Sequence, residues 1–537
     1  MSAIFLNKES LPRITHNVMA WTAIYSSLLT AGQVAHLLRR ASFGPTPEQL
    51  KAFSGKSASD VVTVLMKANP AEHPTDPAGK TFHDLPYGTP ETDSQKQNAL
   101  DEQRAVLVKQ WWLGLMLDPA RGFFEKLSLF WQNHFVIATT DVNDVRYVYT
   151  YLTTIRQNAL GSFRNFVVEV TKDPAMLRYL NGNENLVGRP NENYARELME
   201  LFALGRDNYT ENDIKEAARA LTGWQVLNYR STRTAEIGSQ FNLQRHDKEG
   251  KIFSDNFQKF EIKGRDNGTA GDDELQELVD MLLRHPESAR FIVRKFYRWY
   301  FTAEISEEVE KNFIEPMAIE FRKTFEIAPL LKKMLTSDHF FDPAIQAAQI
   351  RSPLDFVMGT LLLVGNEVPN ATLDRRIYDL LTNTIFRRAR VLEMDVLDQP
   401  TVFGWRPYYD AGYYKIWING TTLGLRGEFA EQAVKGANAQ GLRPDVVRLV
   451  NTLSVPGDAL ELVKGLWALL MAVPPSQEQL DNVIDEVLLE GIPRYEWTEI
   501  WNTYRANQND NTAINNVRFR VESVLAYLMR MAEYQIG

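Results

Sequence analysis

The chain has 537 residues, of which 44% are hydrophobic and 24% are charged. These fractions are typical of soluble globular proteins and exclude a largely disordered or collagen-like chain. The 59 Lys and Arg residues against 68 Asp and Glu residues give a net charge of −9, which provides no positive field for a nucleic acid. There is no cysteine, which excludes disulfides, thiolate nucleophiles and cysteine-ligated metal centres.

Residues 1–28 are expected to form an N-terminal arm. No apolar run approaches the roughly 18 residues of a membrane span, so no transmembrane segment is predicted. Val18–Leu29 is the best candidate for the apolar part of a signal peptide, but polar residues interrupt it and no typical cleavage site follows. The compartment stays open: exported if a signal was removed, and otherwise cytoplasmic.

Residues 29–224 are predicted to form a helical lobe. Thr30 with Gln33, and Thr46 with Gln49, have the spacing of capping boxes, and apolar residues then recur at helical spacing. Further helices are predicted over residues 100–117 and from residue 123 through 134. Asn191 is expected to cap a helix that ends at Gly205.

Residues 225–270 change character, because Thr, Tyr and Phe alternate with polar residues around an Asp-Lys-Glu-Gly turn. This pattern predicts a small β excursion. Residues 271–537 are predicted to form a C-terminal helical lobe, interrupted by an aromatic loop region that contains Trp405, Tyr408, Tyr409, Tyr413, Tyr414 and Trp417. The expected fold class is mainly α: a large multi-lobed helical domain with a small antiparallel β element.

The segment from Pro190 to Glu200 is the richest in polar groups that could carry chemistry. On a helix, Asn193, Glu197 and Glu200 share one face, and Glu192 and Arg196 form a separate pair four residues apart. Converging carboxylates and an amide suit a hard metal ion or a general base. The alternative is a solvated, salt-bridged stripe that follows an Asn cap.

Two histidines are further candidates. His134 lies in an aromatic helix, where a buried imidazole needs a partner for each ring nitrogen. It can be a metal ligand or an acid–base group, or simply a core residue bonded to the backbone or to a carboxylate. His246 and Asp247 adjoin on the predicted turn, where they can bind a metal or cap the turn.

Arg39 and Arg40 are candidates for binding an anionic group. Guanidinium groups bind carboxylate and phosphate in a bidentate way. The structural alternative for these two arginines is a salt bridge to Glu197 or Glu200.

Several of these segments, in this order, resemble the bacterial domain of unknown function 1800 family. The resemblance runs through nearly the whole chain from about residue 28, and RPNENYARELMELFALG (189–205) is its most specific part. The other main segments are HLLRRASFGPTPEQL (36–50), LFWQNHF (129–135), YTENDIKEAARALTGW (209–224), HDKEGK (246–251) and HPESARFIVRKFYRWYF (285–301). It implies a large, mostly helical domain, often on exported proteins, and genes beside a partner family that resembles sulfatases and alkaline phosphatases.

Two positions depart from the family pattern. Gln132 stands where members often have His, which removes one ligand from any two-histidine site built with His134. Gly404-Trp405-Arg406-Pro407 replaces the usual Gly-Trp-Pro-Gly, which weakens any transfer of roles to that region.

Two functions are therefore predicted. The first is an enzyme with a metal or acid–base site, in which His134, Glu197 and Glu200 are catalytic and Arg39, Arg40, Asn193 and Arg196 bind substrate. Its metal ligands would be His134, Glu197, Glu200, His246 and Asp247, which suit Zn, Fe or Mn; haem is a weaker variant. The second is a non-catalytic accessory or assembly protein, in which the polar cluster is structural and the aromatic loop region contacts a protein partner. A saccharide platform is a third, weaker reading of the same aromatic residues.

Overall fold

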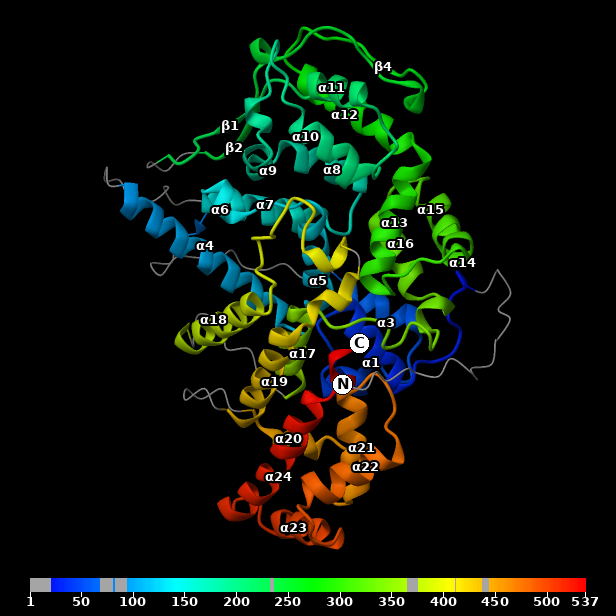
Figure 1. Cartoon of the computed structure of the whole chain (residues 1–537), viewed down its shortest axis with the longest axis vertical. Coiled ribbons are helices and arrows are strands. Elements are labelled where there is room, and N and C mark those ends of the chain that lie inside the picture. Colours follow the sequence, from blue (N-terminus) through cyan, green and yellow to red (C-terminus); the bar gives the residue numbers. More distant parts are fainter. Residues whose placement is uncertain are drawn as a thin grey trace.

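The computed structural model describes residues 21–67, 81–82, 94–231, 236–364, 375–410, 412–436 and 444–537. Within these ranges the protein is mainly helical, as predicted, with two small antiparallel sheets (Figure 1). Residues 1–20 of the expected arm lie outside the described ranges. The rest of that arm contacts the body, where Trp21 stacks on His339 and Ile24 forms a β-bridge with Ser337.

The first two helices begin where the sequence predicts. Capping boxes at Thr30 and Thr46 confirm the predicted starts of the first two, because each threonine accepts from the backbone three residues on. The helices are α1 (Ala31–Ala41), α2 (Pro47–Phe53), α3 (Ala58–Leu65), α4 (Ser94–Met116), α5 (Gly122–His134), α6 (Thr139–Val142), α7 (Val145–Asn158), α8 (Phe163–Lys172) and α9 (Pro174–Tyr179).

The predicted helix from Asn191 to Gly205 is present but changes geometry half-way. Asn191 caps α10 (Glu192–Glu197), as predicted, and a π-helical segment over Leu198–Ala203 follows without a break. Gly205 then ends the segment in a left-handed conformation with φ 80°. The next helix, α11 (Glu211–Ala220), starts with a capping box at Thr210.

The predicted β excursion is confirmed as two separate hairpins. β1 (Trp224–Leu227) pairs antiparallel with β2 (Gly238–Phe241), and Trp224 lies opposite Phe241. β3 (Lys251–Ile252) pairs antiparallel with β4 (Glu261–Ile262). In Figure 1 the hairpin with β4 lies at the top of the molecule, near α11, and β1 and β2 lie at the left, near α9.

The helices after residue 270 line one side of the molecule and then form its lower part (Figure 1). They are α12 (Ala270–Arg284), α13 (Pro286–Tyr300), α14 (Glu307–Val309), α15 (Glu315–Phe321), α16 (Ile327–Leu335), α17 (Pro353–Leu363), α18 (Arg375–Val391), α19 (Gly420–Lys435), α20 (Val446–Asn451), α21 (Ala459–Leu470), α22 (Gln477–Asn482), α23 (Tyr495–Ala506) and α24 (Asn511–Arg530).

A single contiguous set of buried apolar side chains runs from Leu29 to Tyr534. Aromatic rings are dense around α5, where Trp131 contacts Phe163, Phe166 and Phe296. Burial of such large rings is the main stabilising term of the fold, and their packing fixes α5 against α8 and α13. None of the described helices has both the length and the apolar character needed to cross a membrane.

Candidate functional site

The C-terminal turn of α5 holds the aromatic loop region in place. The side-chain amides of Gln132 and Gln399 bond to each other in full burial, and Asn133 accepts a 2.9 Å hydrogen bond from the backbone of Trp405. Gly404 allows this close approach: its φ is 96°, and a Cβ there would lie 2.3 Å from the Asn133 amide oxygen. The loop after α18 is therefore fastened to α5.

His134, the last residue of α5, connects two other elements. Its Nε2 lies 3.1 Å from the carbonyl oxygen of Phe202, and its Nδ1 lies 2.9 Å from the Nζ of Lys295 on α13. Because a carbonyl oxygen only accepts, Nε2 carries the proton and Nδ1 is the acceptor. Burial, and next the charge of Lys295, hold the pKa of His134 well below its usual value, so the ring is neutral.

Lys295 has unusual surroundings for a lysine. Its Nζ donates to His134 and, at 3.0 Å, to the carbonyl oxygen of Leu201, and it lies 4.8 Å from the centre of the Phe291 ring. No carboxylate of the described residues pairs with it. Burial, with a smaller contribution from Arg298, lowers the pKa of Lys295 to about 7.

The π-helical segment supplies the two carbonyl groups in this arrangement. The backbone N–H of Leu204 bonds five residues back, to Met199, so the helix ends in a wide turn. The carbonyl oxygens of Leu201 and Phe202 lie in that last turn, where helix carbonyls lack partners further along the helix. Lys295 and His134 satisfy them, and the π-helical geometry thus fixes the pair.

This pair forms part of the wall of a cavity of about 480 Å³, called here the aromatic cavity. Its volume lies within the range of small-molecule sites, about 300–1,000 Å³. Its lining residues are Phe130, Asn133 and His134 from α5, Glu200 and Leu201 from the π-helical segment, Gly205 and Arg206, Phe291, Lys295, Arg298 and Trp299 from α13, and Phe403, Tyr408, Tyr409, Asp410 and Tyr413 from the aromatic loop region.

Glu200 is the only carboxylate predicted as catalytic that lines this cavity. It accepts a 2.6 Å hydrogen bond from the guanidinium of Arg206 and a 2.8 Å hydrogen bond from the hydroxyl of Tyr209. These bonds hold the carboxylate in one orientation at the wall. The structure thus places His134 and Glu200 at the wall of the same cavity. Lys295, on α13, also lines this cavity and contacts His134 on α5.

The family described as "Protein of unknown function (DUF1800)" matches residues 36–536, nearly the whole chain. The chain belongs to the DUF1800 family. No curated protein and no solved structure matches the sequence.

In this DUF1800 protein, Glu197 does not line the aromatic cavity. It is partly buried one helical turn before Glu200. Burial, and next the nearby charge of Glu200, raise the pKa of Glu197 to about 7. The charge of Glu197 also contributes to raising the pKa of Tyr179, so these two side chains lie near each other.

The other polar residues of α10 have structural contacts. The Asn193 side chain is exposed and donates to the carbonyl oxygen of Leu180 at 3.2 Å. Arg196 forms a bidentate ion pair with Glu211, at 2.8 and 2.7 Å, and a longer contact with Glu192. Neither residue lines the aromatic cavity, and their role in substrate binding stays a prediction.

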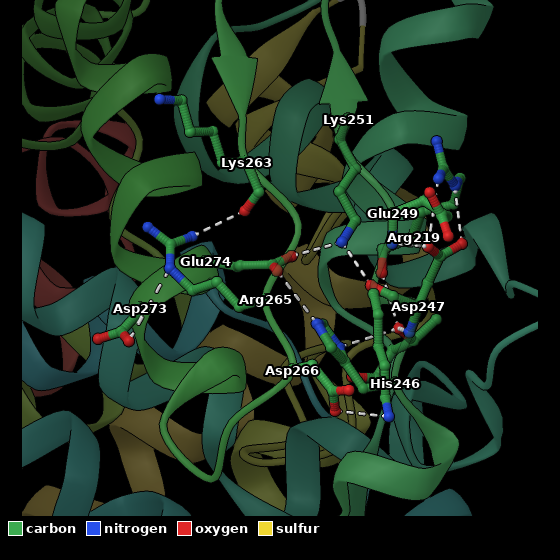
Figure 2. Close-up of polar contacts among 12 residues, drawn as sticks. Arg219, His246, Asp247, Glu249, Lys251, Lys263, Arg265, Asp266, Asp273 and Glu274 are labelled. Atoms are coloured by element: carbon green, nitrogen blue, oxygen red, sulfur yellow. Dashed lines mark hydrogen bonds and ion pairs between the residues drawn. The ribbon is translucent and has the colours of Figure 1, made fainter.

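His246 and Asp247 belong to a different cluster, at the β excursion. Figure 2 shows the carboxylate of Glu274 between His246, 3.2 Å away, and Lys251, 2.6 Å away. Asp247 accepts from Arg219 and from the backbone of Glu249, so it caps the turn, which is the structural alternative of the sequence analysis. Neither contacts His134, Glu197 or Glu200.

The described residues include no group of three or more His, Asp or Glu side chains that could hold a metal ion. His134 uses both ring nitrogens on Phe202 and Lys295, and Asp247 is paired with Arg219. In the aromatic cavity these contacts occupy both ring nitrogens of His134.

Arg39 and Arg40 do not contact Glu197 or Glu200, which was the structural alternative for them. Arg39 donates to the carbonyl oxygen of Leu469 at 2.9 Å, and Arg40 donates to that of Tyr300 at 3.0 Å. Both arginines line a second, smaller cavity.

Lys295 is not among the residues predicted from the sequence, although the sequence contains a signal for it. Lys295 lies three residues after Ile292 and four before Trp299, both of which are buried. A lysine at helical spacing within an apolar face is unusual and marks a position with a special environment. The spacing of residues could not predict that Lys295 lies beside the ring of Phe291 or that it bonds to the π-helical segment.

Proposed function

We propose that this protein is an enzyme that binds a small organic molecule in the aromatic cavity and moves a proton to or from it through Lys295. The observation that carries the proposal is the uncompensated amine of Lys295 at the wall of this cavity, next to a neutral imidazole. Lys295 is partly buried, and lysines withdrawn from solvent without a carboxylate partner are uncommon in a structural role, because their charge is costly to bury.

The hydrogen bonds of Lys295 define what its amine can do. Two of its hydrogens are directed to His134 and to the Leu201 carbonyl oxygen. The remaining position on the nitrogen is a lone pair in the amine and an N–H bond in the ammonium ion. With a pKa of about 7, both forms are populated near neutral pH, which suits a general base or acid.

The cavity walls indicate the class of ligand. Seven aromatic side chains line the cavity, namely Phe130, Phe291, Trp299, Phe403, Tyr408, Tyr409 and Tyr413. Tyrosine hydroxyls and the oriented carboxylate of Glu200 add polar contacts to these apolar faces. This combination favours a small organic molecule with a planar or apolar body and a few polar groups.

Proton transfer can be tested without knowledge of the complete reaction. Ligand-observed NMR first selects, from a panel of small carbonyl compounds, those that bind the protein. These ligands are then incubated with the protein in D2O containing EDTA, and deuterium incorporation next to the carbonyl group is followed by NMR. We expect exchange with wild type and none with Lys295→Met.

Lys333→Met is the matched control, because Lys333 forms an ion pair with Glu320 outside the cavity. It should exchange deuterium like wild type. Exchange that persists in Lys295→Met, or no exchange with any ligand that binds, would overturn the proposal. Elemental analysis of the purified protein tests the predicted Zn, Fe or Mn, and about one metal per chain, lost in Glu200→Gln, would favour a metal enzyme instead.

A further inference from the structure

The smaller cavity combines several buried positive charges with a single carboxylate side chain. It has a volume of about 30 Å³, and its charged lining side chains are Arg39, Arg40, Lys126, Arg351 and Asp355. These four cations are between 4% and 8% exposed. We call it the cationic cavity. It lies where α1, α5 and the segment before α17 meet.

Asp355 neutralises only one of these cations. Its carboxylate lies 2.7 Å from the Nζ of Lys126 and accepts a 2.9 Å hydrogen bond from Ser352. Arg39 and Arg351 donate to the peptide carbonyl oxygens of Leu469 and Leu470. Arg40 donates to the peptide carbonyl oxygen of Tyr300 and, at 3.3 Å, to an oxygen of Gly537, the last residue of the sequence, which also lines the cavity. Arg351 also lies 4.4 Å from the Tyr534 ring.

Several N–H groups of these arginines have no acceptor. They include the Nε of Arg39, the Nη2 of Arg40 and the Nε of Arg351, all buried. Burial, and next the charge of Arg351, lower the pKa of Arg39 to about 9, and burial lowers that of Arg40 to about 10. Buried donors that carry a charge are normally paired, so a bound anion would supply the acceptors that these three N–H groups lack.

Two fully buried cations elsewhere in the described residues are paired with carboxylates, whereas Arg426, beside Arg351, donates to the carbonyl oxygen of Arg351 instead. Arg146, which is fully buried, forms an ion pair with Asp144 at 2.6 Å. Lys251 pairs with Glu274 at the same distance, also in full burial. In the cationic cavity, by contrast, the side chains of Arg39 and Arg351 have no carboxylate partner in the part of the chain that the structure describes. They line a space that other side chains do not fill.

We propose that the cationic cavity is a binding site for a small oxyanion, either free phosphate or sulfate, or the carboxylate or phosphate group of a larger ligand. Guanidinium groups bind such groups through paired N–H donors. A volume of about 30 Å³ exceeds the roughly 10–15 Å³ that one water needs, and it is too small for a nucleotide or a sugar. Trp299 and Tyr408 line both cavities, so a bound anion lies behind a wall of the aromatic cavity.

Two measurements test this site. Ion chromatography of the anions released when the purified full chain is denatured should give about one oxyanion per chain. After exhaustive dialysis into chloride, isothermal titration with inorganic phosphate, sulfate and acetate at constant ionic strength should show saturable binding of at least one of them. Acetate binding without phosphate or sulfate binding would identify a carboxylate group as the occupant.

Arg351→Gln should weaken the binding at least tenfold, with an unchanged circular dichroism spectrum. Arg39→Gln provides a second test if the first variant does not fold. Arg206→Gln is the matched control: it removes a cation from the aromatic cavity and should bind the anion like wild type. Absence of both a released oxyanion and saturable binding, or binding that survives both cavity substitutions, would overturn the proposal.

Discussion

Lys295 is expected to be a neutral amine under mildly alkaline conditions in which ordinary lysines are charged. Burial lowers its pKa from 10.5 to about 7. This shift corresponds to about 5 kcal/mol against the charged form. At pH 8, about 90% of Lys295 would be uncharged, against about 0.3% of an ordinary lysine, a ratio of roughly 300.

Competitive acylation measures this difference directly. The protein is treated with a trace of an acylating reagent between pH 6 and pH 11, and labelling of each lysine is quantified by peptide mass spectrometry. The labelling rate of Lys295 should reach half of its plateau near pH 7. A free lysine derivative added to the same sample serves as the reference, and its labelling rate should still rise beyond pH 9.

The position of the midpoint decides the result, because burial can slow labelling without moving its pH dependence. A midpoint for Lys295 above about pH 9.5 would refute the reasoning, since it would show a lysine that stays charged in the cavity.

Three further predictions concern the walls of the aromatic cavity and its attachment to α5. Because the pKa of Glu197 is raised to about 7, ionisation of this carboxyl group lowers the stability of the wild-type protein as the pH rises from about 4.5 to 7. Glu197→Gln should therefore match wild type at pH 4.5. At pH 8 its free energy of unfolding should exceed that of wild type by about 1–2 kcal/mol, after allowance for the partial exposure of Glu197. Equal pH dependence of both proteins in urea unfolding would contradict this sign. Gly205→Ala places a Cβ 3.1 Å from the Phe291 ring in a left-handed conformation, and should lower stability by about 1–2 kcal/mol in the same assay; an unchanged value would mean that the π-helical segment ends differently. Gln132→Ala removes the side-chain partner of the buried Gln399 amide and leaves it one 3.4 Å contact with the backbone oxygen of residue 132. It should cost about 2–4 kcal/mol and increase hydrogen exchange in the aromatic loop region; exchange as slow as in wild type would show that the other contacts of the loop suffice.

The sequence predicted most of the helical architecture because its signals are local. The capping boxes at Thr30, Thr46 and Thr210 depend on residues three apart, and each is present. The cap at Asn191 and the end at Gly205 are also as predicted. The π-helical turn between Asn191 and Gly205 was not predicted. Its geometry depends on which distant side chains donate hydrogen bonds to the carbonyl groups of its last residues.

The structure brings some of the predicted site residues together and separates others. His134 and Glu200 do line one cavity, since α5 and the π-helical segment pack against each other. His246 and Asp247 form a separate cluster with Glu274 and Arg219, which their position along the chain could not reveal.

The sequence by itself determined which residues form helices, where those helices begin and end, and to which family the chain is similar. These properties follow from hydrophobic periodicity and from caps, which act over a few residues. Only the tertiary structure decided that Lys295 contacts His134. It also decided that Arg39 and Arg351 line one cavity in which cationic side chains outnumber carboxylate side chains. The burial of a charged side chain and its hydrogen-bond partners depend on contacts between residues far apart in the chain. Burial and partners together determine the pKa of the side chain, and therefore its chemistry.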